Sequence, residues 1–315
     1  MNDAAPVDAR GLVKRYGDIV AVDHVDLEVA RGDVFGYLGP NGAGKTTSLR
    51  MLLGLIRPTA GSARLFGRDP LVDGAKALDG VAGFVEGPRF CAYLSGRRNL
   101  QLLADYDEPV SRPRIDEVLE LVELRDRAKD RVGGYSHGMR QRLGIAASLL
   151  RQPQLLLLDE PTTGLDPAGI RDMRRLVRRL AGEGITILLS SHLLNEVEEL
   201  CNRVAIIRKG SVIYQGALRD LLATAVSRFR LRALDPERAR AALLAQPGVG
   251  DVELRDGELR FAADDRTVAT LSVALGQARI AFTVLVPETA SLEELFLGMT
   301  GGDSSDHDSA ETIAV

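Results

Sequence analysis

The 315-residue sequence predicts an α/β protein in which a strand-rich domain carries a helical insert and is followed by a small α+β domain. Three observations support this prediction. Short apolar segments of strand length alternate with helical segments over most of the first 220 residues. Between about residues 88 and 152 the pattern is typical of helices. A second set of strands and helices begins near residue 226, and the chain is long enough for a second core.

The first elements surround a glycine-rich octapeptide. Strand-like segments at Val7–Lys14 and Val25–Val29 come first. The apolar run Val34–Leu38 predicts a buried strand, and Thr47–Leu53 has the periodicity of a helix. Between these two lie residues 39–46, Gly-Pro-Asn-Gly-Ala-Gly-Lys-Thr, which fit the pattern G-x-x-x-x-G-K-[ST].

This strand, loop and helix are typical of a phosphate-binding loop. The glycines let backbone N–H groups turn toward a polyphosphate, and the helix N-terminus adds its positive dipole. We expect Lys45 to bridge the β- and γ-phosphates and the Thr46 hydroxyl to hold Mg²⁺. A chance glycine-rich turn is the alternative, which the flanking strand and helix disfavour. The predicted nucleotide-binding residues of the loop are Gly39, Pro40, Asn41, Gly42, Ala43, Gly44, Lys45, Thr46 and Thr47.

The remaining elements of the first domain follow from the same periodicities. Further strands are expected at Ser62–Phe66, Val81–Val85, Leu155–Leu158, Ile185–Ser190, Val204–Ile207 and Ser211–Tyr214. Helices are clearest at Ile115–Leu124 and Met139–Leu150, and Ala217–Ala225 is expected to be a short connecting helix. The helix around residues 171–180 has arginines on one face, which indicates a solvated amphipathic face rather than a nucleic-acid stripe.

The C-terminal part has the order β-α-β-β-α-β, which resembles a small ferredoxin-like module. Its expected elements are Arg228–Ala233, Pro236–Leu244, Val249–Arg255, Glu258–Ala262, Thr267–Ala278 and Ala281–Val286, followed by a helix at Ser291–Leu297. We therefore expect domains at residues 1–225 and 226–300, with a helical subdomain at about 88–152. Residues 301–315 are expected to be a disordered acidic tail.

Two acids end the apolar strand Leu155–Leu158. Because ligands bind at the carboxyl ends of strands in open α/β sheets, we expect Asp159 and Glu160 to face the nucleotide. Asp159 would orient Mg²⁺, and Glu160 could accept a proton from the attacking water.

Over about Val7–Gly216, the chain resembles the ATPase subunit of an ABC transporter. Residues 39–46 are similar to that family's Walker A motif, 155–160 to Walker B, 136–141 (Ser-His-Gly-Met-Arg-Gln) to the signature motif and 163–166 to the D-loop. His192 matches the switch histidine, and Tyr16 lies where the family stacks an aromatic ring on adenine. The motifs keep the family's order, which makes the resemblance more specific than any one of them.

The resemblance implies a P-loop NTPase of the ABC type, with ATP and Mg²⁺ as ligands. Glu160 and His192 would be the catalytic residues, and Ser136 and Gly138 would face a γ-phosphate. It also implies a homodimer of ATPase subunits on a separately encoded membrane permease, at the cytoplasmic face of the membrane. A soluble ABC ATPase acting on ribosomes or DNA is the alternative, and a nucleotide-binding scaffold without turnover is a third.

Two motifs depart from the family pattern. The signature contains His137 and Met139, and Glu86 stands where the Q-loop usually presents Gln. A carboxylate there could approach Mg²⁺, so Glu86 is a third candidate metal residue, although its charge would repel the triphosphate. These departures resemble the drug- and antibiotic-export branch, so a drug, an antibiotic or a lipid-like compound is the expected cargo.

The net charge and the apolar runs of the sequence agree with a peripheral transporter subunit. The formal net charge of −4 gives no bulk attraction to nucleic acid, and no nucleic-acid partner is expected. The two cysteines lie far apart without metal-ligand spacing. Apolar runs stay well below the ~20 residues that a membrane-spanning helix needs, so the chain is expected to be peripheral.

Overall fold

The computed structural model describes residues 4–106, 112–223, 228–288 and 292–300. The chain divides into two compact units, Met1–Leu218 and Arg219–Val315, and each is described by itself. The acidic tail expected at residues 301–315 lies outside the described residues.

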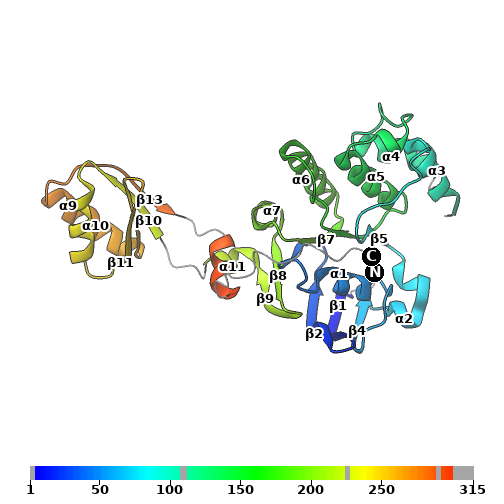
Figure 1. Cartoon of the computed structure of the whole chain (residues 1–315), viewed down its shortest axis with the longest axis horizontal. Coiled ribbons are helices and arrows are strands. Elements are labelled where there is room, and N and C mark those ends of the chain that lie inside the picture. The colour runs from blue at the N-terminus through cyan, green and yellow to red at the C-terminus, as the bar shows by residue number, and fades with distance from the viewer. Residues whose placement is uncertain (1–3, 107–111, 224–227, 289–291, 301–315) are drawn as a thin grey trace. The chain divides into compact units, whose positions relative to one another are not determined.

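The first unit contains two sheets (Figure 1). Its strands are β1 (Val7–Tyr16), β2 (Ile19–Val29), β3 (Val34–Leu38), β4 (Ala60–Leu65), β5 (Val81–Phe84), β6 (Leu155–Asp159), β7 (Thr186–Ser191), β8 (Arg203–Arg208) and β9 (Ser211–Ala217). The order β2-β1-β4 forms an antiparallel sheet. The order β5-β6-β7-β3-β8-β9 forms a second sheet, parallel except for β9. This part of the predicted fold, an α/β unit with a phosphate loop after a buried strand, is confirmed.

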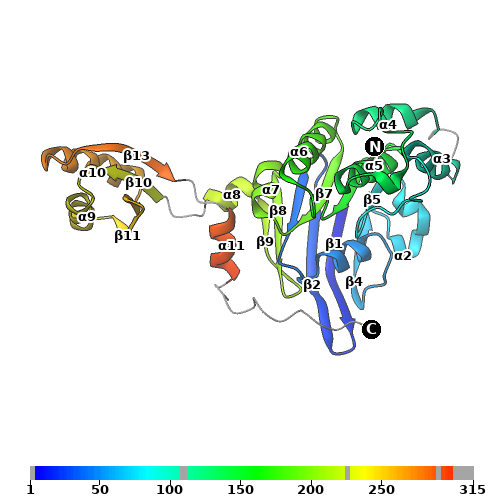
Figure 2. The same cartoon turned by 45° about the horizontal axis from the view of Figure 1, so that its top comes forward.

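The helices of the first unit pack around these sheets. They are α1 (Lys45–Leu52), α2 (Pro70–Asp73), α3 (Gly96–Tyr106), α4 (Ile115–Leu121), α5 (His137–Leu149), α6 (Pro167–Gly182) and α7 (Leu194–Leu200), with 3₁₀ turns η1 (Gly74–Leu78), η2 (Arg112–Arg114) and η3 (Val132–Gly134). Between β5 and β6 the chain leaves the sheet, and α3, α4 and α5 lie together as a helical insert (Figure 2).

One apolar core joins the two sheets through α1. Leu49, Met51 and Leu52 of α1 pack with side chains of β1, β2 and β4 on one side and of β3, β6, β7 and β8 on the other. All five residues of β3 and of β6 are buried, as expected for central parallel strands covered on both faces. This packing fixes the position of α1, whose N-terminus forms the phosphate loop.

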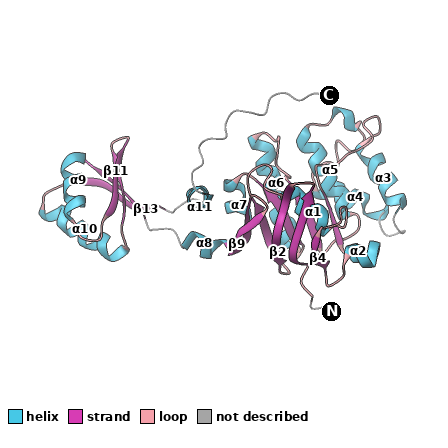
Figure 3. Ribbon diagram, turned by 60° about the horizontal axis from the view of Figure 1, so that its bottom comes forward, coloured by secondary structure: helices cyan, strands magenta, loops and turns pink. Residues whose placement is uncertain are grey.

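The second unit contains one antiparallel sheet. The elements that follow the first unit are α8 (Leu218–Ala223), β10 (Arg228–Ala233), α9 (Pro236–Ala245), β11 (Gly250–Arg255), β12 (Glu258–Ala262), α10 (Asp265–Gln277), β13 (Phe282–Glu288) and α11 (Leu292–Thr300). The strand order is β11-β12-β10-β13. Helices α9 and α10 cover one face of this sheet (Figure 3), and their apolar side chains form its core with Phe229, Leu231 and Phe261.

Candidate active site

The phosphate loop connects the buried strand β3 to α1. Gly44 is the N-cap residue of α1 and has φ 106°, a conformation that residues with a Cβ rarely adopt. A Cβ at this position would also lie 2.4 Å from the carbonyl oxygen of Ala21. The motif therefore needs glycine here for two separate reasons, and the helix that follows begins at Lys45.

The Lys45 side chain lies folded back inside the loop. Its Nζ donates to the carbonyl oxygens of Gly39 at 2.7 Å and Pro40 at 3.1 Å. Its Nζ is also 3.2 Å from Oε1 of Glu160, and the lysine side chain is only 6% exposed. These three partners hold the buried ammonium in place.

Asp159 receives donors from three segments of the chain. Its Oδ2 accepts from the Thr46 hydroxyl at 2.9 Å and from the Glu86 backbone N–H at 3.3 Å. Its Oδ1 accepts from the Ser190 hydroxyl at 2.5 Å. The carboxylate is buried, so these hydrogen bonds replace the water that it would otherwise bind.

Glu160 lies between Lys45 and His192. Its Oε2 is 2.7 Å from His192 Nδ1 and accepts from the Thr163 hydroxyl at 3.1 Å. Burial alone would raise the pKa of Glu160, but the charge of Lys45 and the hydrogen bond with His192 outweigh burial and lower it. The backbone of Glu160 has φ 49°, and its N–H donates to the Ser190 hydroxyl at 2.9 Å.

The sheet explains why residues so far apart in sequence meet. Strand β7 lies between β3 and β6 and is parallel to both, so the carboxyl ends of the three strands reach the same edge of the sheet. Asp159 stands opposite Ser190, and Leu38, the last residue before the loop, stands opposite Ser191. His192 follows directly, and the structure thus brings together Lys45, Thr46, Asp159, Glu160 and His192.

Ser136 and Gly138 line a different cavity of about 400 Å³. Ser136 caps α5 by accepting from the Met139 N–H at 3.2 Å, and Asp166 caps α6 in the same way through Gly169. The two helix N-termini border this cavity together with Gly164 and Leu165. His137 packs against the backbone of this D-loop segment, since a Cβ at Gly164 would lie 3.5 Å from its ring.

The two other predicted site residues lie at the edges of this region. Tyr16 ends β1, is half exposed, and has the Lys14 ammonium 5.0 Å from its ring centre. Glu86 reaches Asp159 through its backbone N–H, whereas its carboxylate is paired with Arg50. The assignment of Glu86 as a metal residue remains a prediction. Its carboxylate is paired with Arg50 in this structure and does not supply a contact to a metal ion.

Sequence reasoning missed two polar groups beside the site. Ser190 is completely buried, and its hydroxyl joins Asp159 to the backbone of Glu160. Glu196 on α7 is hydrogen-bonded to the Thr162 hydroxyl, and burial raises its pKa against the opposing effect of that bond. A signal for Ser190 was present, because it is a polar residue at the end of an apolar strand.

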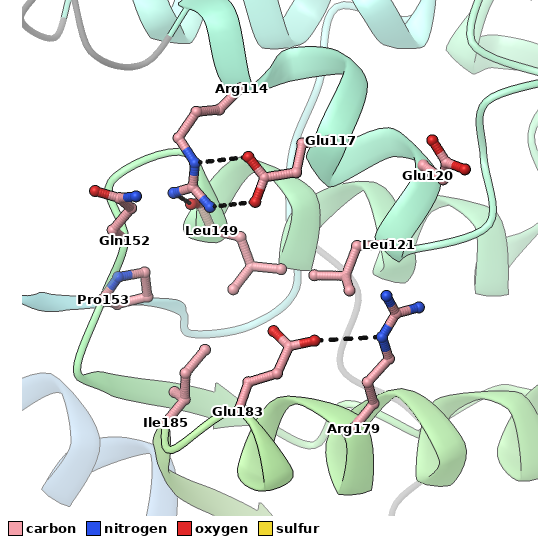
Figure 4. Close-up of a pocket in the computed structure, with 10 residues that line it drawn as sticks. All are labelled: Arg114, Glu117, Glu120, Leu121, Leu149, Gln152, Pro153, Arg179, Glu183 and Ile185. Atoms are coloured by element: carbon pink, nitrogen blue, oxygen red, sulfur yellow. Dashed lines mark hydrogen bonds and ion pairs between the residues drawn. The ribbon is translucent and has the colours of Figure 1, made fainter.

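A separate cavity of about 490 Å³ lies beside the end of α6 (Figure 4). Arg114 donates to both carboxylate oxygens of Glu117, at 3.1 and 2.9 Å, and to the Leu149 carbonyl. Arg179 is paired with Glu183 at 3.3 Å. Because these charges satisfy one another, they favour no particular ligand.

A phosphate loop after β3, a histidine directly after the adjacent parallel strand β7 and two acids at the end of β6, the next strand, define a P-loop nucleoside triphosphatase. Comparison with known proteins narrows this class. The family model described as ABC transporter matches residues 22–163. The chain belongs to the family of ABC transporter ATP-binding proteins, as its similarity to members along their whole length shows.

Two relatives and one solved structure illustrate this similarity. The bacitracin transport ATP-binding protein of Bacillus licheniformis is 40% identical, covering 92% of this chain and 96% of that protein. A daunorubicin resistance ATP-binding protein of Streptomyces coeruleorubidus is 39% identical, covering 96% and 98%. A solved ATP-binding subunit of an ABC transporter has a TM-score of 0.61 and 29% identity, covering 69% of this chain and 92% of that one.

The chain is thus an ATP-binding subunit and an ATPase of the drug-export branch of this family. The names of these relatives concern transport and resistance, which gives no support to an action on ribosomes or DNA. Across the described residues, each helix is too short or too polar to cross a membrane.

Proposed function

We propose that Glu160 and His192 form the catalytic pair of this ATPase, and that hydrolysis drives the export of a drug- or antibiotic-like compound through a membrane permease. The observation that carries the proposal is the position of the Glu160 carboxylate, 3.2 Å from Lys45 and 2.7 Å from His192. The names of the bacitracin and daunorubicin relatives support the class of cargo.

The loop residues Gly39–Thr47 would hold the phosphates of ATP through backbone N–H groups and the Lys45 ammonium. Lys45 would exchange its carbonyl partners and Glu160 for β- and γ-phosphate oxygens, which form stronger charge-assisted bonds. Release from Lys45 leaves Glu160 free to accept a proton from water. Tyr16, half exposed at the end of β1, would stack on adenine.

The residues fit a magnesium ion. The Thr46 hydroxyl and the Asp159 carboxylate are 2.9 Å apart and offer only oxygen atoms, the donors that Mg²⁺ prefers. Groups of three or more His, Cys, Asp or Glu able to hold a metal do not occur among the described residues, which agrees with an ion completed by phosphate and water. When bound, Mg²⁺ would neutralise charge on the phosphate oxygens.

Glu160 fits the role of general base, and His192 that of its orienting partner. A glutamate of ordinary pKa 4.5 is already ionised at neutral pH, and transfer of Lys45 to the phosphates would remove one cause of the lowered pKa, so the carboxylate would become a better proton acceptor. His192 fixes the carboxylate through Nδ1 and, once ATP is bound, would contact the γ-phosphate.

Two copies of the chain would complete each site. Ser136 and Gly138 line a different cavity from the Lys45 cluster, so a second copy is the simplest source of a signature motif for the bound triphosphate. A head-to-tail pair of identical subunits would form two equivalent sites.

The permease would bind to an apolar cavity of about 570 Å³ beside β5. The insert supplies Leu103 and Tyr106 to this cavity, and the loop after β5 supplies Arg89 and Phe90. The loop also carries Glu86, so a ligand in the cavity would act directly on the nucleotide site. This contact would place the subunit at the cytoplasmic face of the membrane. The segment Arg89–Asn99, which joins the loop after β5 to the helical insert, would contribute to the same contact with the permease.

The proposed domains are a nucleotide-binding domain at residues 1–225 and an accessory domain at 226–300, whereas the compact units divide after Leu218. The accessory domain would be ferredoxin-like, which the antiparallel order β11-β12-β10-β13 and the two covering helices support. Its role would lie in assembly or coupling rather than in nucleotide chemistry.

The variant Glu160→Gln tests the catalytic assignment. The amide keeps the size of the side chain but cannot accept a proton, so turnover should fall by at least about a hundredfold. ATP binding should persist, and an ATP-bound dimer should accumulate on size-exclusion chromatography. Steady-state hydrolysis near the wild-type rate would remove Glu160 from the role of base.

A further inference from the structure

The Glu86 residue has its backbone at the nucleotide site and its carboxylate directed elsewhere. Its N–H donates to Oδ2 of Asp159 at 3.3 Å, the same atom that accepts from Thr46. Its carboxylate forms an ion pair with the Arg50 guanidinium. The backbone of Glu86 has φ 66°, so the residue is held in the left-handed region that disfavours side chains.

Arg50 is fixed to the phosphate-binding helix itself. It lies in the last turn of α1, the helix that begins with Lys45 and Thr46. Its backbone carbonyl accepts from the Leu55 N–H at 2.9 Å, which orders the chain after the helix. A cation in the last turn is also favoured by the helix dipole. The guanidinium is therefore presented at a defined place beside the loop that follows β5.

The charge at Glu86 needs a partner if the site is to bind a triphosphate. The residue is bonded to an atom of Asp159, so a free carboxylate here could turn toward Asp159 and the phosphates. Like charges in such a partly buried site repel one another and weaken anion binding. Arg50 supplies the opposite charge and directs the carboxylate away from Asp159.

We propose that Arg50 is a positioning residue that pairs with Glu86 and keeps its negative charge away from the nucleotide site. The pair thereby allows an acid to stand at the Q-loop position without loss of ATP affinity. This inference rests on the proposed nucleotide-binding role of Lys45, Thr46 and Asp159. It also links α1 to the loop that borders the apolar cavity beside β5.

The exposure of the pair separates this role from a purely stabilising one. The side chains of Arg50 and Glu86 are 33% and 56% exposed. Exposed ion pairs contribute little to stability because water and salt screen them. The variants should consequently fold, and their effect should appear in nucleotide affinity.

The test is a double-mutant cycle in the full-length chain, with the affinity for a fluorescent ATP analogue as the main readout. Arg50→Gln should weaken binding about fivefold, the effect of losing one partly exposed charge pair. Adding Glu86→Gln to this variant should restore the wild-type affinity, because no unpaired carboxylate remains. The defect of Arg50→Gln should also shrink as salt concentration rises.

Two controls make the cycle specific. Arg64→Gln removes an equal charge from an exposed position on β4 and should leave affinity unchanged. Arg50→Lys keeps the positive charge and should retain most of the affinity. Wild-type affinity in Arg50→Gln, or a defect that Glu86→Gln does not repair, would overturn the proposal.

A further variant separates this inference from the proposed function. If Lys45→Ala binds the analogue as tightly as the wild type, the assignment of the nucleotide site itself is wrong. If Lys45→Ala loses binding while Arg50→Gln retains it, only the role of Arg50 is wrong.

Discussion

The single carboxylate of Glu160 illustrates how neighbouring charges set the behaviour of a residue. Burial opposes its ionised form, but Lys45 at 3.2 Å and His192 at 2.7 Å favour that form, and the pKa is lowered. In the unfolded chain these partners are absent, so the carboxyl returns to its ordinary pKa of 4.5. The folded state therefore binds this proton less readily than the unfolded state.

This difference predicts a pH dependence of stability. A group with a lowered folded-state pKa contributes stability above its unfolded pKa and loses it as pH falls through the folded pKa. In urea unfolding from about pH 7 to about pH 3.5, the wild type should lose free energy of unfolding relative to Glu160→Gln. A gap between the two proteins that stays constant with pH would contradict the pairing.

Ser190 is expected to position both acids of the site. Its buried hydroxyl donates to Asp159 and accepts from the Glu160 N–H, so Ser190→Ala removes both bonds at once. We expect kcat to fall roughly tenfold, as for other residues that orient ligating or reacting groups. ATP affinity should change less, because the phosphate loop is untouched.

The control for Ser190→Ala is Ser148→Ala. Ser148 is another buried serine, but its hydroxyl bonds the Gly144 carbonyl within α5. Removal of the Ser148 hydroxyl should leave kcat unchanged. If the two variants have the same steady-state kinetics, Ser190 has no positioning role.

At the residue scale, the sequence predicts the site residues that belong to recognisable motifs. It does not predict which other residues they contact. Lys45, Glu160 and His192 could be predicted because each stands in a recognisable motif or after an apolar strand. The contacts of Arg50 and Ser190 could not be predicted, although Ser190 itself carried a signal, since these contacts depend on which strand lies beside β6 and how α1 faces the loop after β5. Such contacts depend on the order of the strands in the sheet, which the hydrophobic periodicity of the sequence does not reveal.

Among the secondary-structure elements, short strands bounded by turn residues were the easiest to predict. The bounds of β3, β10 and β12 agree with the sequence, because a short apolar or alternating run is bounded by turn residues. In contrast β2 begins at Ile19 rather than Val25, since it pairs with β1 through a hairpin after Tyr16. The short helix α7 was not predicted, because it has too few turns to show a periodicity.

The helix α3 provides a test of permease docking. Leu103 and Tyr106 are 43% and 92% exposed and line the apolar cavity beside β5. Replacing both with Ser should abolish the stimulation of ATP hydrolysis by the permease while the isolated subunit keeps its basal rate. Both side chains lie at the surface, so the loss of packing should be small.

Two further variants locate the contact. Leu71→Ser changes an exposed leucine on α2 and should have no effect on coupling. Tyr93→Ser changes an exposed residue of the segment Arg89–Asn99 that does not line the cavity. Uncoupling by Tyr93→Ser but not by the double variant would move the docking surface from the cavity to that segment.

In the molecule as a whole, each compact unit has its own apolar core. One core joins the two sheets of the first unit, and a separate one lies between α9, α10 and the antiparallel sheet of the second. The sequence pattern changes near residue 226, whereas the two compact units divide after Leu218. The difference reflects α8, a helix with only six residues between the two cores.

The separate cores predict that nucleotide binding survives removal of the second unit. Every residue assigned to the nucleotide site precedes β8, and the first unit keeps its core without β10 or the elements that follow it. A chain ending at Ala223 retains α8, so the buried Leu218 and Leu221 remain present. Its affinity for ATP should stay within about twofold of the full-length value, because independently packed units contribute little to one another's sites.

The full-length chain is the control, and circular dichroism establishes that the shortened chain is folded. A defect should appear instead in assembly with the permease, which is measured by co-purification from membranes. A shortened chain that is folded but cannot bind ATP would show that the second unit contributes to the nucleotide site.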